Sequence, residues 1–182
     1  MLNTILGSFS SGVAASTSSY ESIATVTVGS GGAADVTFSS IPATYKHLQI
    51  RWINPTTNTG GNVVVNFNND TSTSNYAFHN VRGNGSSASA LGFASGGGNS
   101  TLFANEALSA GVADILDYAN TNKYKVSRTL GGNEFNNTSG MVSLNSSLWL
   151  NTAAISTIKL TADVTGGWAQ YSSVALYGIK GA

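Results

Sequence analysis

Short stretches of alternating apolar and polar residues run along most of this chain and predict β-strands. In 24–28, Ala and Val alternate with Thr, and in 47–53 Leu48, Ile50 and Trp52 alternate with His, Gln and Arg. An alternation with a period of two residues places apolar side chains on one face of a strand and polar ones on the other. Further strands are expected in the stretches 34–38, 63–67, 76–82, 112–118, 124–130, 142–150, 158–162 and 172–179.

Segments rich in Gly, Ser and Asn separate the predicted strands. Residues 29–32 (GSGG) predict a turn that joins 24–28 to 34–38 as a hairpin, and 120–122 (NTN) predict a second hairpin. Residues 83–99 are rich in Gly, Ser and Ala and have no period, which predicts a long surface loop. About nine or ten short strands with irregular loops and no clear helix favour an all-β, two-sheet antiparallel sandwich of the jelly-roll type.

The length of 182 residues is that of one domain. We expect the β-sandwich to occupy residues 20–182 and residues 1–19 to form an extended N-terminal arm. The arm carries apolar residues that cannot form a core alone, so it is expected to be flexible or docked on a partner. Its predicted partner-binding residues are Leu2, Ile5, Leu6 and Phe9. No Lys or Arg lies near the start, and Ser and Gly interrupt the apolar part, so a signal peptide is not expected.

The composition narrows the classes of function. Charged residues make up 9% of the chain, with 8 Lys and Arg against 8 Asp and Glu, and there is no Cys. A chain without Cys has no disulfide framework and no thiolate metal site. No basic cluster indicates a nucleic-acid surface, and no apolar run approaches the roughly 20 residues of a membrane-spanning helix. A chain with few charges and zero net charge is not kept apart from its neighbours by repulsion, which suits a subunit that packs into an assembly.

Residues able to carry out catalysis are few. A serine hydrolase needs a nucleophile, a base and an orienting acid, but the chain has no G-x-S-x-G motif and only two histidines, His47 and His79. Paired carboxylates could hydrolyse glycosidic bonds, but the acids are scattered, and Asp114 and Asp117 would point to opposite faces of a strand over 112–118. We therefore predict no catalytic residues, no cofactor and no enzymatic activity.

One cluster offers oxygen ligands for a metal ion. It comprises Asn66, Asn68, Asn69 and Asp70. Calcium accepts such ligands, but the spacing of a calcium-binding loop and its distal Glu are missing. Because Asn and Asp also favour turns through local hydrogen bonds, we interpret this cluster as a turn and predict no metal site.

Two side chains are predicted as anchors for a protein partner. Arg51 lies on the polar face of the strand that carries Leu48 and Ile50, and Trp168 follows the Gly166–Gly167 turn. Aromatic and Arg side chains commonly dominate the energy of protein interfaces. Most aromatic residues of an all-β chain instead lie in the core or pair across strands, so the position of Trp168 decides its role.

Four stretches of the sequence resemble one family of proteins. They are 20–26 (YESIATV), 38–51 (FSSIPATYKHLQIR), 117–125 (DYANTNKYK) and 175–180 (ALYGIK). Together they resemble small structural proteins of tailed bacteriophages, common in aquatic phages. The resemblance spans both ends and the middle of the chain and includes no active-site motif. It implies a virion component with a jelly-roll-like domain, either on the head or on the tail.

The expected function is therefore that of a non-enzymatic virion protein. The chain has no shaft repeats or coiled-coil heptads, which a fibre usually needs to project a tip domain. A capsid decoration or cement protein on the head surface is preferred, bound to the major capsid protein or to tail components. A homo-oligomer is expected, with a trimer preferred by analogy with viral jelly rolls. The alternatives are a tail-fibre or baseplate adhesin that binds host glycans and, from a different class, a glycan depolymerase.

Overall fold

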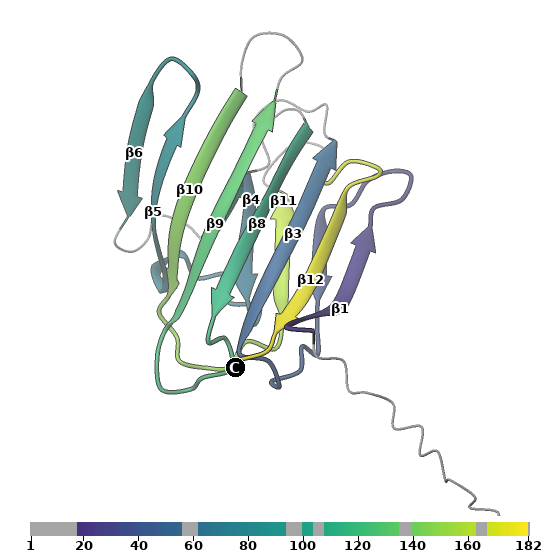
Figure 1. Ribbon diagram of the computed structural model, residues 1–182, viewed down its shortest axis with the longest axis vertical. Helices are drawn as coiled ribbons and strands as arrows, with labels where there is room; N and C mark the ends of the chain where they lie inside the picture. Colours follow the sequence, from purple (N-terminus) through teal and green to yellow (C-terminus); the bar gives the residue numbers. More distant parts are fainter. Residues whose placement is uncertain are drawn as a thin grey trace, which may run out of the picture.

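The computed structural model describes residues 18–55, 62–93, 100–103, 108–134, 140–162 and 167–181. In these ranges the chain forms antiparallel strands and one short 3₁₀ helix, Thr73–Asn75 (Figure 1). The strands are β1 (Tyr20–Thr27), β2 (Asp35–Phe38), β3 (His47–Pro55), β4 (Asn62–Phe67), β5 (Tyr76–Gly83), β6 (Ala88–Phe93), β7 (Ser100–Phe103), β8 (Leu108–Leu116), β9 (Lys125–Glu134), β10 (Gly140–Trp149), β11 (Ile158–Ala162) and β12 (Ser173–Ile179).

Two sheets pack face to face. The larger has the order β1-β12-β3-β8-β9-β10-β5-β6, and the smaller has the order β2-β11-β4-β7. In Figure 1 the large sheet faces the viewer, and β4 and β11 lie behind it. The expectation of an all-β, two-sheet antiparallel sandwich is confirmed.

Eight of the strands form a jelly roll. β1 pairs with β12, β2 with β11, β3 with β8 and β4 with β7, each antiparallel. Successive pairs belong alternately to the large and the small sheet. This is the arrangement of one long hairpin rolled into two sheets, which is the topology of a jelly roll.

The other four strands extend the large sheet beyond the jelly roll. β9, β10, β5 and β6 follow one another outward from β8, so that β6 is the last strand of the sheet. We call β5, β6, β9 and β10 the extension. In Figure 1 it occupies the left part of the sheet, with the β5–β6 hairpin at the far edge.

The hydrophobic core lies between the two sheets of the jelly roll. Period-two alternation in β3 turns Leu48 and Ile50 inward, where they are 0% and 1% exposed, and leaves Arg51 outside. The main core side chains from both sheets are Val36, Phe38, Leu48, Ile50, Val63, Val65, Ile115, Ile158, Leu160, Val174 and Leu176. Trp52 is also part of this core and is 4% exposed. A Cβ on Gly111 would lie 2.1 Å from the Trp52 ring, so β8 needs glycine there.

Most of the predicted strands are confirmed, including the hairpin that joins 112–118 to 124–130, now β8 and β9. The hairpin predicted across 29–32 is wrong, because β1 lies in the large sheet and β2 in the small one. Gly31 and Gly32, with φ of 95° and 74°, lie in the segment that takes the chain from one sheet to the other. Two adjacent strands of similar alternation therefore pair with distant strands rather than with each other.

The loop predicted over 83–99 is wrong in part. Residues 88–93 form β6, which pairs with β5 in unbroken register from Gly83↔Ala88 to Phe78↔Phe93. The sequence pattern did not predict this strand, because its Ala, Ser and Gly residues have a low strand propensity. Pairing with β5 stabilises the strand instead. Residues 1–17 of the predicted arm, with Leu2, Ile5, Leu6 and Phe9, lie outside the described residues. β1 starts at Tyr20, where the predicted domain begins.

Candidate functional site

The outer face of the extension carries exposed aliphatic side chains. The exposed fractions of Val81, Leu130, Val142 and Leu144 lie between 52% and 58%. They come from β5, β9 and β10, and we call these four residues the outer patch. Strand register places Leu130 opposite Leu144, and Leu144 opposite Val81, so three of the four form one row across neighbouring strands.

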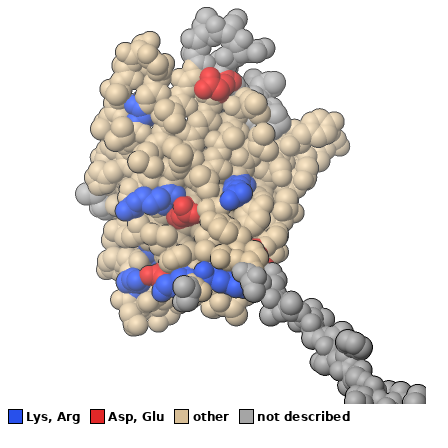
Figure 2. All heavy atoms as spheres, in the orientation of Figure 1, with Lys and Arg blue, Asp and Glu red and all other residues tan. Residues whose placement is uncertain are grey.

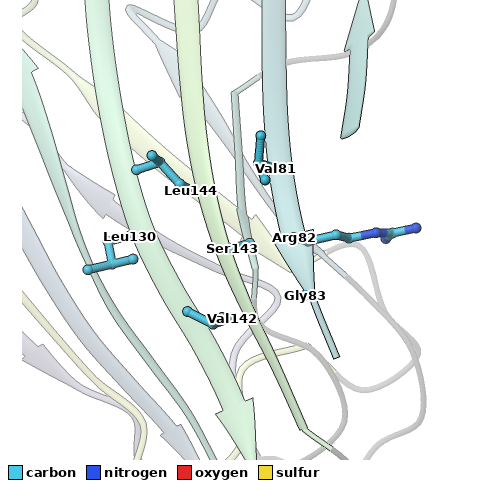
Figure 3. Close-up of a pocket in the computed structure, with 7 residues that line it drawn as sticks. All are labelled: Val81, Arg82, Gly83, Leu130, Val142, Ser143 and Leu144. Atoms are coloured by element: carbon cyan, nitrogen blue, oxygen red, sulfur yellow. The ribbon is translucent and has the colours of Figure 1, made fainter. Parts of the chain in front are cut away.

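The outer patch surrounds a shallow hollow (Figure 3). Its lining is almost entirely apolar, since Arg82 points away from the four aliphatic side chains in Figure 3. Arg82 belongs to the other face of β5, where its Nε donates to the Ser89 hydroxyl at 3.1 Å. An uninterrupted apolar patch on a sheet surface is typical of a site that another molecule covers.

The inner face of the extension is polar over most of its length. In β10, Ser143, Asn145 and Ser147 point into the sandwich, while Val142 and Leu144 point out to solvent. Apart from Lys125, the polar side chains buried on this face are Asn80, Ser127, Thr129, Asn133, Ser143, Asn145 and Ser147, and Ser109 of the neighbouring β8 lies opposite Asn133. We call them the inner polar layer. The usual rule for a sheet with one buried face is therefore reversed in the extension.

Several atoms of the inner polar layer find no hydrogen-bond partner within the described ranges. They are Asn80 Oδ1, Ser109 Oγ, Thr129 Oγ1, Ser147 Oγ and both side-chain polar atoms of Asn145. Thr129, Asn145 and Asn80 lie side by side on three adjacent strands. A buried polar group without a partner costs about 1–3 kcal/mol, so this face contributes little to the stability of the sandwich.

Apolar residues return at one end of the extension's inner face. Tyr76 and Trp149 are paired across β5 and β10 and are almost fully buried. The Trp149 ring centre lies 5.7 Å from that of Phe67 in the small sheet. This contact joins the extension to the jelly roll. Phe78, Phe93 and Leu91 are further apolar residues of the inner face, in β5 and β6.

Charged side chains are sparse on the outer face of the large sheet, as Figure 2 shows. Arg51 is exposed there, as predicted. Its Nε donates to Gln49 Oε1 at 2.8 Å, and Gln49 Nε2 donates to Asp114 Oδ1 at 2.7 Å. The guanidinium carbon lies 5.8 Å and 5.3 Å from the ring centres of Tyr20 and Tyr177. Arg51 is thus held in one orientation at the jelly-roll end of this face.

The position of Trp168 corrects the prediction of a surface anchor. Its side chain is 0% exposed, and its Nε1 donates to the Leu160 carbonyl at 3.1 Å. Its main chain exchanges two hydrogen bonds with Ala33. Gly167 has a φ of 66°, and a Cβ there would lie 2.3 Å from the Ala33 carbonyl oxygen. Gly167 therefore allows the chain to direct Trp168 into the core, where no partner can reach it.

The Asn- and Asp-rich segment after β4 forms a turn. Asn68 and Asn69 have positive φ, and the Asn68 side chain bonds the main chain of the 154–157 segment. Burial acts to raise the pKa of Asp70, but hydrogen bonds from Trp149, Asn75 and Ser72 outweigh burial, and the pKa lies below its usual value. No cluster of His, Asp or Glu within the described ranges could hold a metal ion.

His47 lies beside Asp117, with its Nδ1 3.7 Å from the Asp117 Oδ1 atom. His47 Nδ1 accepts a hydrogen bond from the Asp117 amide at 2.9 Å. Asp114 faces out from β8, but the strand ends at Leu116, so Asp117 lies in the following turn rather than on the opposite face of a strand. Asp117 is ion-paired with Lys46 and Lys123. These contacts hold the turn after β8.

Lys125 is a buried cation that the sequence did not single out. It is 1% exposed, and its Nζ donates to the carbonyl oxygens of Asn120, Lys123 and Thr152 at 2.7–2.9 Å. Burial, followed by the charge of Lys123, lowers the pKa of Lys125. Its three carbonyl partners tie the β8–β9 turn to the segment after β10, which is a structural role.

Comparison with known proteins adds no relative. No protein-family model matches the chain, and no significant match is found among curated proteins or solved structures. None of the helices in the described ranges is long and apolar enough to cross a membrane. The outer patch is therefore the feature of this chain on which a functional interpretation rests.

Proposed function

We propose that this chain is a non-enzymatic structural subunit of a bacteriophage virion. It attaches as a decoration protein to the head surface, with the major capsid protein as its partner. The phage assignment rests on the resemblance of residues 20–26, 38–51, 117–125 and 175–180 to small phage structural proteins. The mode of attachment rests on the outer patch.

The reversed polarity of the extension is the observation that carries this proposal. Four aliphatic side chains face solvent while polar side chains of the same strands face inward. Covering one leucine is worth about 1.5–3 kcal/mol, so the outer patch offers several kcal/mol to a partner with an apolar surface. A protein that binds only the assembled shell stabilises that shell by mass action.

The N-terminal residues 1–19 are proposed as a second attachment element. Leu2, Ile5, Leu6 and Phe9 are the apolar residues of this segment. Removing residues 1–19 is expected to leave the sandwich folded, since β1 starts at Tyr20, and to weaken attachment to the particle.

The test uses particles of the encoding phage that lack this protein. We expect them to release DNA at a lower temperature than complete particles, and purified wild-type protein to restore their heat resistance. Leu144→Asp should bind at least about tenfold more weakly in co-sedimentation, because it loses apolar burial and places a carboxylate in the contact. Thr25→Asp is the matched control, since Thr25 is exposed at the other end of the same register row.

Two results would contradict the proposal. Equal binding by Leu144→Asp and the wild type would exclude the outer patch as the attachment surface. Particles that keep their heat resistance but lose adsorption to host cells would favour the adhesin. One observation favours that second candidate. Tyr20 and Arg51 are exposed on the outer face of the jelly roll with the half-buried Tyr177 beside them, and exposed aromatic rings offer a stacking surface for a sugar.

A further inference from the structure

Within the described ranges the two sheets have four edge strands, and three of them carry features that block pairing with another chain. β1 contains a register shift between Ser22 and Ala24 and the charged Glu21, which is paired with Lys180. β2 has four residues and the charged Asp35, and β7 also has only four residues. Bulges, charges and short length are the usual means by which edge strands avoid pairing with other molecules.

The fourth edge strand, β6, has none of these features. Its six residues are Ala-Ser-Ala-Leu-Gly-Phe, without charge or proline, and its pairing with β5 has no bulge. All six residues are exposed, and no other strand in the described ranges pairs with the free edge. A regular, uncharged and exposed edge presents a row of main-chain N–H and C=O groups ready to pair.

We propose that β6 pairs antiparallel with β6 of a second copy of this chain across a two-fold axis. The pairing joins the two large sheets into one continuous sheet. Antiparallel pairing is the arrangement that a two-fold axis imposes on identical strands, and every ladder of the described strands is antiparallel.

Charge supports a second copy as the partner. Like charges on both copies would repel in a symmetric interface, but β6 carries no charge and the whole chain has zero net charge. The nearest cation on β5, Arg82, is turned to the Ser89 hydroxyl of β6. A strand without charge and with small side chains is compatible with its own copy at close range.

In the joined sheet, β6 contributes apolar side chains to both the inner and the outer face. On the inner face, Leu91 and Phe93 are 48% and 40% exposed, and the Phe93 ring centre lies 5.3 Å from that of Phe78. On the outer face, Ala90 is opposite Val81, the last member of the outer-patch row. Two-fold pairing would therefore extend an aromatic cluster inside and bring two outer patches onto one surface.

The experiment measures the mass of the purified protein by light scattering and sedimentation over a concentration series. We expect the wild type at twice the chain mass of 18.6 kDa. Leu91→Lys places a cation at the middle of the edge and should give the single-chain mass over the same range. Thr25→Lys, at an exposed position of the opposite edge strand, should remain dimeric. Circular dichroism confirms folding, and Ala90→Lys replaces Leu91→Lys as the test variant if the latter fails to fold.

Amide hydrogen exchange identifies the surface that pairs. Slow exchange in residues 88–93 of the wild type and fast exchange in Leu91→Lys are expected. Leu144→Asp should stay dimeric, because the outer patch is not the pairing edge. A wild type that remains monomeric, a trimer, or a dimer that Leu144→Asp abolishes and Leu91→Lys preserves would each overturn the proposal. These measurements use no virion, so their outcome is separate from that of the particle experiment.

Discussion

The jelly-roll half and the extension half of the large sheet bury opposite kinds of side chain. In β3, Leu48 and Ile50 face the core and Arg51 faces solvent. In β10, Asn145 faces inward and Leu144 faces solvent. The two halves share one continuous hydrogen-bonded sheet, yet the apolar face changes side between β8 and β10.

This difference separates the two sources of stability in the sheet. The jelly roll is held by apolar burial between two layers, which is the dominant favourable term in folding. Most of the extension is held by main-chain pairing to β8 and by the Trp149–Phe67 contact at one end. The apolar surface of the extension does not stabilise the isolated chain and remains available to a partner.

The largest expected effect comes from the core of the jelly-roll half. Trp168→Ala removes a fully buried indole and its hydrogen bond to Leu160, and should lower the free energy of unfolding by about 3–5 kcal/mol. Urea denaturation followed by fluorescence measures it. A loss below about 1 kcal/mol would show that Trp168 is not part of the core.

The same substitution in the two halves tests the comparison directly. Leu176→Ala in β12, where the side chain is 0% exposed, should cost about 2–5 kcal/mol. Leu144→Ala in β10, where it is 56% exposed, should change the free energy of unfolding of the monomeric chain by less than about 0.5 kcal/mol. Denaturant unfolding of both variants measures the two values, and similar losses would refute the reversal of faces.

A smaller change in the free energy of unfolding should distinguish buried hydroxyls that have a hydrogen-bond partner from those that have none. Thr129→Val removes a hydroxyl that has no partner in the described part of the chain and should raise the free energy of unfolding by about 1 kcal/mol. Tyr76→Phe is the contrasting variant. The Tyr76 hydroxyl accepts from the Phe67 amide and donates to the Asp70 carbonyl, so its loss should cost about 1 kcal/mol or more. Thermal unfolding compares them, and destabilisation by Thr129→Val would show that this hydroxyl is satisfied.

The smallest expected effect is a loss of folding stability at low pH, which we attribute to Asp117 in the turn after β8. Hydrogen bonds from Lys123 and Lys46 lower the pKa of Asp117 from 3.8 to about 2. A carboxyl with a lowered pKa stabilises the fold above its unfolded pKa, and this contribution disappears as the pH falls from about 4 towards 2. Asp117→Asn, which tolerates the same positive φ of 48°, should lose less stability over that range. Urea unfolding at pH 5, 3 and 2 measures it, and equal losses would exclude Asp117 as the source.

The alternation of apolar and polar residues predicted the class of the fold and most of its strands, because each strand carries this period of two in its own sequence. It also predicted that Arg51 would be exposed and that the Asn- and Asp-rich segment would form a turn. It failed at β6, whose weak strand propensity is overcome by pairing with β5. It also failed at Trp168, because its environment depends on Gly167 and Ala33, which lie far apart in the sequence.

The sequence by itself determined that this chain forms short antiparallel strands, with few charges and no Cys. The tertiary structure alone decided which partner each strand has and which face of each strand is inside. Alternation makes two faces different but does not state which is buried, since that depends on whether a second sheet covers it. The outer patch and the open edge of β6 follow from this tertiary arrangement, because both arise where the large sheet extends beyond its jelly-roll half.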